Sequence, residues 1–551
     1  MPRAAVHVLG YLWLGILGIA LGFSALTADR QTRQVEEYAA FCDPFGYLQI
    51  AQDTRQAVAE RRLPTYSIET NHARLLINLM KSQNVPTRYW DDLVAPLCYH
   101  YSPRADHLGV QYPPGAGWML AMFPQGTALH SMNRVVIALF LVTGLAMLVV
   151  AGLTRSWFSA GLFVLALVVG LEMLARIDNA SFSINAMFAP LLLCGLFLSA
   201  AFVFQNRKAG LLSRAGLLTF VSGLCFGFAI VVRLQIMFLL PGLLVLLWPG
   251  RTRQLLKSGL VNFLLAVLVG GVFPLMFNQS RVTGSWFEST YGVGNTDPPS
   301  LKSIWPNLHF YFDPGKPSQY NWALPVVLIG CVGLLVWLRH KRSADDGEFL
   351  ILTRFRLILA AVVMWAIPTT YFLTHEVTGH HYPIATIFLT SLTLGLGSLW
   401  LEAHRTDKEI ENKTRNWLRP AGLLLALAPG VFSITETWTN YLPATTERPA
   451  HSFTLPAELA DEKAWVWSSE LSGSLWYYAH KPAHKINFSG PNERKIVYKF
   501  VQDRLEPQYI IEDGPDMKRM MEEMVQFGAS LEQRGSVDGF PYYLVHWSGG
   551  P

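Results

Sequence analysis

VVIALFLVTGLAMLVVAGL, which spans Val135–Leu153, is an apolar run that contains no charged residue. About 20 residues of this kind are long enough to cross the ~30 Å hydrocarbon core of a bilayer as an α-helix. Similar runs recur along the chain, and the charged residues collect in short clusters between them. The pattern predicts an integral membrane protein that crosses the bilayer many times.

The composition agrees with this interpretation. Of the 551 residues, 51% are hydrophobic and 15% are charged, whereas an average soluble domain carries about 25% charged residues. The net charge of +5 arises from cations in short segments between the apolar runs, which is the distribution expected of cytoplasmic loops. We therefore predict the lipid bilayer as a partner and no nucleic-acid partner.

We expect about eleven transmembrane helices of near-spanning length. Basic clusters precede the fifth run and follow the sixth, and both clusters belong in the cytoplasm. The chain must therefore cross the membrane twice between them, with Arg233 at the outer turn. The expected helices are Val8–Ala25, Val135–Leu153, Trp157–Ala175, Phe182–Phe204, Ala215–Val232, Leu234–Trp248, Gly259–Phe277, Trp322–Trp337, Phe355–Tyr371, Tyr382–Trp400 and Ala421–Ile434.

The same rule sets the orientation of the chain. With a cytoplasmic N-terminus, residues 27–133, 278–321 and 436–551 lie on the extracytoplasmic side of a cell inner (plasma) membrane. No clear small-x-small cleavage site follows the first run, so we expect that run to stay as an anchor. A cleavable signal peptide is the alternative.

The chain divides into a polytopic α-helical membrane domain, residues 1–435, and a polar C-terminal domain, residues 436–551. Short alternating apolar runs in the second domain predict strands, and Met517–Gln526 has a helical pattern. We therefore expect an extracytoplasmic α/β domain. Its strands are expected at Trp465–Trp467, Tyr509–Ile511 and Tyr542–Val545.

Asp43 lies shortly beyond the first helix, at the membrane face. A carboxylate there is costly to hold near lipid unless it is paired or used, and it could act as a general base toward an acceptor hydroxyl or amine. An Asp-Pro pair is also an ordinary helix start, so Asp43 could instead be an N-cap. The same loop ends in Tyr112-Pro113-Pro114-Gly115, which predicts a rigid turn before a helical stretch.

Three more charged residues lie at outer helix ends. Arg176 and Asp178 flank the end of the third helix, where Asp178 could be a second acid and Arg176 could bind phosphate. A salt bridge between the two is the simpler alternative. Arg233 stands on the outer side against the positive-inside bias, and its guanidinium suits bidentate phosphate binding. A snorkelling side chain is the alternative here.

The segment His375–Pro383 joins the ninth and tenth helices and includes His380, His381 and Tyr382. Its spacing matches no tight zinc pattern, so hydrogen bonding to a phosphate or sugar is favoured over metal binding. An ordinary polar loop would have the same composition.

The outer loops also carry two cysteines and a group of aromatic residues. Cys42 and Cys98 share the first outer loop, where an oxidising compartment would allow a disulfide; two free thiols are the alternative. Trp286 and Phe287 precede Glu288 in the second outer segment. These aromatic rings could stack on sugars or belong to the interfacial belt.

Together, these motifs resemble the GT-C superfamily of membrane glycosyltransferases, especially the bacterial members related to protein mannosyltransferases and aminoarabinose lipid A transferases. Asp43 with Tyr47 resembles the early outer-loop aspartate of the family, and Tyr112–Gly115 resembles a Tyr-Pro-Pro-Gly turn of many members. Asp178 is similar to a second aspartate after the third helix. Arg233 is similar to an arginine that precedes a proline-containing apolar run.

A Gly-Ser-aromatic stretch at Gly284–Trp286, after Asn278, also resembles the family, and many members end in an outer α/β domain. The chain departs from the family at three places. Pro44 stands where glutamate often follows the first aspartate, and His381 stands where an arginine often precedes the tyrosine. No Asp-x-Asp is present at Asp178, so a metal requirement has no support.

The resemblance implies transfer of a sugar from a polyprenyl-phosphate donor to a lipid, glycan or protein acceptor, with inversion. It implies no certain cofactor; a divalent metal ion is compatible with this chemistry, but no ligand motif supports one. Asp43 and Asp178 are the implied catalytic residues. The implied donor-phosphate ligands are Arg233, Arg176, His380, His381 and Tyr382, and the implied substrate-binding residues are Tyr47, Gln111, Tyr112 and Glu288.

Three other classes of function stay open from the sequence. A transporter or flippase would carry ionisable residues near the membrane midplane and repeated halves, whereas the candidates here lie at outer helix ends and no repeat is visible. A polymerase or ligase of surface glycans would use a diphosphate-linked oligosaccharide. A structural protein whose outer domain binds a partner would tolerate replacement of Asp43 and Asp178.

Overall fold

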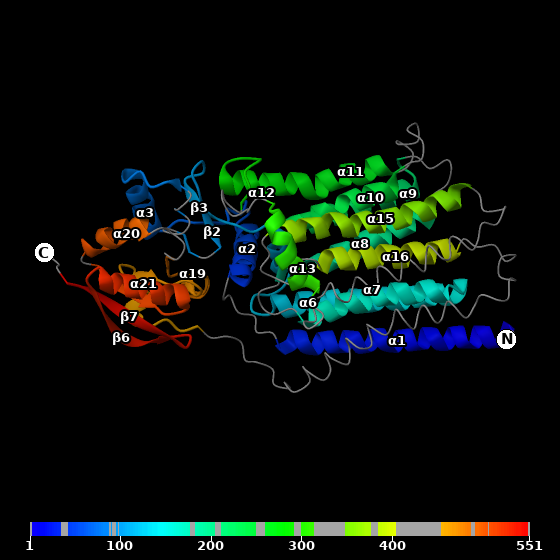
Figure 1. Ribbon diagram of the computed structural model, residues 1–551, viewed down its shortest axis with the longest axis horizontal. Coiled ribbons are helices and arrows are strands. Elements are labelled where there is room, and N and C mark those ends of the chain that lie inside the picture. The colour runs from blue at the N-terminus through cyan, green and yellow to red at the C-terminus, as the bar shows by residue number, and fades with distance from the viewer. Residues whose placement is uncertain are drawn as a thin grey trace.

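The structure, a computed structural model, has a bundle of long helices at one end and a smaller domain of strands and helices at the other (Figure 1). The two chain termini lie at opposite ends of the molecule. The described residues are 3–34, 42–87, 90, 95–96, 98–176, 182–203, 211–248, 259–290, 299–312, 348–375, 384–403, 453–485, 491–504 and 506–548, some of them by backbone alone.

The chain is a multi-pass membrane protein. Among the described residues, six helices are long and apolar enough to cross a bilayer, and three apolar helices are shorter. The predicted spans Trp322–Trp337 and Ala421–Ile434 lie outside the described residues.

The bundle elements are α1 (Arg3–Gln34), α6 (Ala128–Thr154), α7 (Trp157–Arg176), α8 (Phe182–Val203), α9 (Arg214–Val232), the 3₁₀ helix η3 (Leu234–Leu239), α10 (Leu240–Leu247), α11 (Leu260–Val267), the π-helical turn η5 (Leu268–Val272), α12 (Phe273–Thr283), α15 (Glu348–Thr374) and α16 (Ile384–Ala403).

The fifth and sixth predicted runs are separate helices, as the flanking charges predicted. Helix α9 ends at Val232, and Arg233 has an extended backbone with φ −151° and ψ 117° before η3 and α10. Near the start of α11, Asn262 Nδ2 donates to the carbonyl oxygens of Leu211 and Gly216, at 2.7 and 3.0 Å. The chain has thus returned to the starting end of α9 between Arg233 and Asn262.

Glycines let α9 approach α11 and η5 closely. A Cβ on Gly227 would lie 2.8 Å from the backbone nitrogen of Gly271. Small residues at such crossings bring helix backbones together, which is how membrane helices gain packing energy without a hydrophobic drive from water. The π-helical turn that contains Gly271 lies at this contact.

Gly227→Ala is expected to destabilise the bundle by about 1–3 kcal/mol, because the added methyl meets backbone atoms that cannot rotate away. Thermal unfolding in detergent would show this as a lower Tm. Gly15→Ala is the matched control, since its Cβ would meet nothing within 4 Å. Equal Tm values for the two variants would contradict the packing described here.

Several helices extend past the predicted ends of their apolar runs. The predicted helix end at Phe277 is wrong, because α12 continues to Thr283. A helix satisfies its own backbone hydrogen bonds, so it can continue into a polar stretch beyond the membrane. Gly284, with φ 74°, ends it by adopting the left-handed conformation.

The first outer loop is itself folded. It contains α2 (Cys42–Ala59), α3 (Asn71–Ser82) and α5 (Gly115–Ala121). A three-stranded antiparallel sheet of order β1-β3-β2 lies beside them. Its strands are β1 (Ser67–Ile68), β2 (Tyr99–Ser102) and β3 (His107–Val110), too short to be recognised from the sequence. The second outer segment contains η6 (Leu301–Ser303) and α13 (Ile304–Phe312).

The C-terminal part of the chain forms a four-stranded sheet of order β4-β5-β7-β6, in which only the β4–β5 pair is parallel. The three predicted strands and the predicted helix are confirmed at β4, β5, β7 and α21. The predicted domain boundary at residue 435 lies outside the described residues. The elements are α18 (Ala457–Ala460), β4 (Trp465–Trp467), α19 (Ser472–Ala479), α20 (Pro491–Gln502), β5 (Gln508–Ile511), α21 (Pro515–Gln526), β6 (Ala529–Val537) and β7 (Phe540–Trp547).

This C-terminal domain rests on the first outer loop. His72 in α3 stacks on Trp465 in β4, with ring centroids 4.1 Å apart. Gly473 in α19 lies directly against the Phe45 ring in α2, leaving no room for a side chain. Burial, with the nearby Lys481 charge, lowers the pKa of His72 to about 4, so this imidazole is neutral at neutral pH. The first turns of α2 therefore lie between the bundle and the C-terminal domain (Figure 1), whereas Val58 near its end is 73% exposed.

Candidate functional site

The start of α2 is held by a pair of tyrosines whose rings are in contact. Tyr47 in α2 and Tyr112 in the Pro-Pro-Gly turn have ring centroids 4.8 Å apart, and both are buried. Gly46 lies against the Tyr112 ring so closely that no other residue fits there. The turn thereby locates the first residues of α2.

The same turn meets the end of α9. Gly115 lies against the backbone of Val231 and Val232, where a Cβ would be 2.6 Å from the Val232 nitrogen. Arg233 is the next residue along the chain. The Tyr112–Gly115 turn thus contacts both the start of α2 and the residues just before Arg233.

Arg233 occupies the break between α9 and η3, at the end of the bundle that the Tyr112–Gly115 turn contacts. Its side chain is 7% exposed, and the extended backbone at this position separates α9 from η3. Phe238 in η3 stacks on Tyr371 near the end of α15, with ring centroids 4.5 Å apart. The end of α15 therefore lies beside the helix that Arg233 begins.

The predicted histidine loop starts from this end of α15. Asn307 in α13 donates through Nδ2 to the carbonyl oxygens of Phe372, Leu373 and His375, at 2.6–3.1 Å. These are carbonyls that a helix C-terminus leaves without intrahelical partners. The loop returns at α16, which also contacts η3. His380, His381 and Tyr382 themselves lie outside the described residues.

Arg176 is the last residue of α7, and its side chain is not described; Asp178 lies in the undescribed stretch 177–181. The helix that follows, α8, packs against both α2 and α5. Near its start, Asn185 donates to Asn133 of α6 at 3.0 Å, and both amides are buried. The turn that carries Asp178 therefore begins and ends at the same end of the bundle as Arg233.

Asp43 is the second residue of α2, and neither its side chain nor that of Cys42 is described. Cys98 is buried, and its Sγ lies 3.9 Å from the Tyr112 hydroxyl. The Cys42–Cys98 pairing and the choice between base and N-cap for Asp43 therefore stay predictions.

Gln111 and Glu288 join the two outer segments to one another. Thr290 Oγ1 donates to the Gln111 carbonyl oxygen at 2.8 Å, and the Gln111 side chain hydrogen-bonds His100. Glu288 lies 3.6 Å from the Arg104 guanidinium. The contact of both residues with substrate stays a prediction.

The ends that carry the predicted site residues are thus neighbours. They are the start of α2, the α7–α8 turn, the break at Arg233 and the α15–α16 turn. Among the described residues, no group of three or more His, Cys, Asp or Glu side chains is placed to hold a metal ion. The Tyr112–Gly115 turn contacts both the start of α2, where Asp43 lies, and the residues just before Arg233.

The sequence interpretation did not include one candidate functional residue, Glu172. Glu172 in α7 lies one helical turn before Arg176 and is half-buried. It is the only acidic residue within the eleven predicted spans, and an ionisable group inside a membrane helix is a default functional candidate. That uniqueness is the signal that would have identified it.

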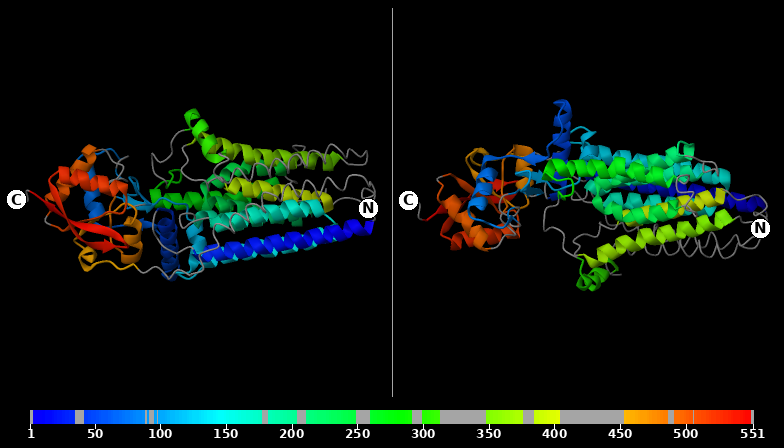
Figure 2. Two further views of the ribbon diagram at one scale, coloured as in Figure 1. Left: turned by 60° about the horizontal axis from the view of Figure 1, so that its bottom comes forward. Right: turned by 90° about the horizontal axis from the view of Figure 1, so that it is seen from above.

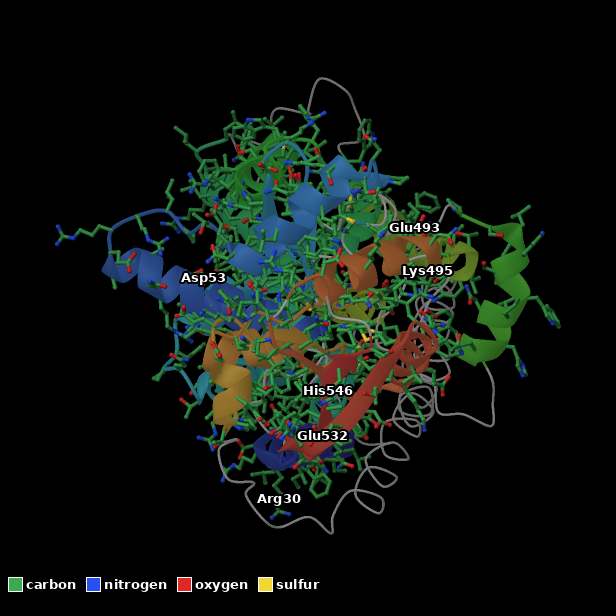
Figure 3. All side chains as sticks on the ribbon, turned by 90° about the vertical axis from the view of Figure 1, so that its left-hand side faces the viewer. Arg30, Asp53, Glu493, Lys495, Glu532 and His546 are labelled. Carbon is green, nitrogen blue, oxygen red and sulfur yellow. The ribbon has the colours of Figure 1, made fainter. Side chains whose placement is uncertain are left out.

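Asp53 is a second partly buried carboxyl, ten residues after Asp43 on α2 (Figure 3). Gln49 Nε2 donates to its Oδ1 at 2.7 Å. Burial raises the pKa of Asp53 from 3.8 to about 6, and the Gln49 hydrogen bond offsets part of that shift. The folded state therefore holds the Asp53 proton more tightly than the unfolded state, and stability falls as pH rises from 3.8 through 6.

Asp53→Asn is expected to raise Tm at pH 7.5, because it removes a buried negative charge that costs up to about 3 kcal/mol. The gain should shrink as pH falls below 6, where the native carboxyl is protonated. Thermal unfolding at pH 7.5 and pH 5 measures both values. Glu69→Gln, an exposed carboxylate of the same loop, is the control and should show no such pH-dependent gain. A Tm that is unchanged or lower at pH 7.5 would show that Asp53 is stabilising as an anion.

An apolar cavity lies at the opposite end of the bundle. It is a partly open hollow lined by residues of α8, α10, α15 and α16. Leu246 and Phe202 line it near the ends of α10 and α8 that are remote from Arg233. Trp400, near the end of α16, closes the same side. This cavity is therefore separate from the candidate site.

No protein-family model matches the chain, and no curated protein matches it significantly. Among solved structures, ArnT from Cupriavidus metallidurans in the apo state is similar over 96% of this chain and 97% of its own, with 13% identity and a TM-score of 0.47. The same protein bound to undecaprenyl phosphate gives 14% identity and a TM-score of 0.48. The apo oligosaccharyltransferase of Archaeoglobus fulgidus is similar over 91% of this chain and 69% of its own, with 12% identity and a TM-score of 0.45.

ArnT and the oligosaccharyltransferase are both GT-C glycosyltransferases, the superfamily that the sequence motifs resemble. TM-scores of 0.45 to 0.48 are too low to carry a functional assignment. The function proposed below therefore rests on this chain's own residues.

Proposed function

We propose that this protein is an integral membrane glycosyltransferase that transfers a sugar from a polyprenyl-phosphate donor to an acceptor hydroxyl or amine. The observation that carries the proposal is the Tyr112–Gly115 turn, which contacts both the start of α2 and the residues before buried Arg233. It brings a carboxylate-bearing helix start and a guanidinium to the same end of a membrane bundle. A transferase that acts on a lipid-linked anion needs both.

The donor enters the site sideways from the bilayer, and its phosphate binds the Arg233 guanidinium. Burial strengthens such a charge-assisted bond, because little water competes for the phosphate oxygens. Arg176 supplies a second cation at the same end of the bundle. His380, His381 and Tyr382 complete the phosphate site with further hydrogen-bond donors.

Transfer proceeds by a single displacement. Asp43 takes the proton of the acceptor O–H or N–H as the acceptor atom attacks the anomeric carbon. The bond from that carbon to the phosphate oxygen breaks, and its electron pair leaves with polyprenyl phosphate. The anomeric centre is inverted, and the cationic side chains stabilise the charge that develops on the departing phosphate. The scheme uses no metal.

The remaining predicted residues orient the substrates. Asp178 is a second carboxylate at the α7–α8 turn and positions the acceptor or a sugar hydroxyl. Tyr47 and Tyr112 form an aromatic wall, and Gln111 and Glu288 supply polar groups from the two outer segments. The reaction faces the extracytoplasmic side of a cell inner membrane, with the N-terminus in the cytoplasm.

Asp43→Asn should lower turnover by about 100- to 10,000-fold, the usual contribution of a general base. Purified protein is incubated with sugars linked to undecaprenyl phosphate or to dolichol phosphate, and release of the free polyprenyl phosphate is measured. Glu69→Gln, an exposed carboxylate of the same outer loop, should keep full activity. Equal release by the parent and Asp43→Asn would remove Asp43 as the base. No release from any donor would favour the transporter alternative.

Arg233→Lys should raise the KM for the donor by about tenfold or more, because lysine keeps the charge but loses the bidentate fork. Steady-state kinetics over a range of donor concentrations measures the effect. Arg74→Lys, the same change at an exposed arginine of the first outer loop, is the control and should leave this KM unchanged. An unaltered KM in Arg233→Lys would place the donor phosphate elsewhere.

A further inference from the structure

Two short helices stand outside the bundle at its outer end. η6 leads into α13, and Figure 2 shows α13 turned away from the long helices. One side of this pair is bound to the chain: Asn307 is 8% exposed, and Tyr311 is 1% exposed against Phe372. On the opposite side, none of the described residues gives such cover.

The uncovered side is strongly apolar. Leu301 is 82% exposed and Trp305 is 79% exposed, and they lie one turn apart. Large apolar side chains at this exposure mark an interaction surface when they occur together. We therefore expect Leu301 and Trp305 to contact a partner that is apolar at this position.

The position of η6 and α13 along the axis of the bundle indicates what this apolar partner is. The apolar span Phe355–Thr374 has 20 residues, and at 1.5 Å per residue it extends about 30 Å, the thickness of the hydrocarbon core. Its last residue, Thr374, accepts a hydrogen bond from the Ser300 nitrogen at 2.6 Å. η6 and α13 are therefore attached where the hydrocarbon ends and the headgroups begin.

The charges of the segment fit a headgroup layer. Lys302 and His309 are exposed beside the apolar pair, and residues 299–312 contain no acidic residue. Tryptophan is enriched at the membrane–water interface, where its ring meets acyl chains and its N–H meets headgroups. Exposed Trp286 and Phe287 follow the outer end of α12 and add to the same belt.

We propose that the face of η6–α13 that carries Leu301 and Trp305 inserts into the headgroup–acyl boundary of the leaflet nearest the C-terminal domain, with phospholipid as its partner. Lys302 meets the lipid phosphates, and Trp305 lies among the upper acyl chains. Asn307, on the opposite face, then fixes the end of α15 relative to the membrane surface. The segment is an interfacial anchor that sets the level of the loop between α15 and α16.

Photo-crosslinking tests this anchor without relying on enzymatic activity. p-Benzoylphenylalanine replaces Leu301 or Trp305 in the full chain, which is placed in nanodiscs of phosphatidylethanolamine and phosphatidylglycerol. Because both side chains are exposed, neither replacement disturbs packing. Val142, a 66% exposed residue in the apolar helix α6, is the positive control. Val525, 50% exposed in α21 of the C-terminal domain, is the negative control.

After irradiation, mass spectrometry of the peptides should detect phospholipid adducts at positions 301, 305 and 142, and none at 525. Adducts at 142 but not at 301 or 305 would overturn the proposal. A cross-link from 301 or 305 to a second copy of this chain would also overturn it and would assign the face to self-association.

Discussion

The outer end of this protein depends on one close backbone contact, between Gly115 and the last turn of α9. Any side chain at position 115 would collide with Val231 and Val232. Pro113 and Pro114 restrict the preceding backbone, so the glycine arrives at this contact in a nearly fixed direction. Because Arg233 follows directly, the contact relates the first outer loop to the guanidinium.

The turn that makes this contact also fixes the start of α2, where the proposed general base Asp43 lies. Its first turns lie under Tyr112 on one side and under Gly473 of the C-terminal domain on the other. A helix start enclosed in this way holds its side chains in a narrow range of positions. Positioning of that kind is worth many kcal/mol to a reaction between two bound substrates.

The C-terminal domain contributes support to the outer loop. Its Trp465 stacks on His72, and burial keeps that imidazole neutral. Helix α13 projects from the bundle and is hydrogen-bonded to the end of α15 (Figure 2). The C-terminal domain therefore contacts the start of α2, and α13 contacts the end of α15.

The amino-acid sequence by itself determined the apolar helices that the structure describes, the reversal at Arg233 and three of the four strands of the C-terminal sheet. Each follows from a local pattern: apolar length, the position of basic clusters, or alternation over a few residues. The motif order also predicted which helix ends carry polar chemistry. These features need no knowledge of what lies next to them in space.

Only the tertiary structure decided which of those ends meet. Gly115 and Val232 are far apart in the chain, as are His72 and Trp465, and neither pair has a sequence signature. The short strands of the first outer loop form only because their partners are present. Burial of Asp53 and the anchoring of α15 by Asn307 arise in the same way, from packing between segments that are distant in sequence.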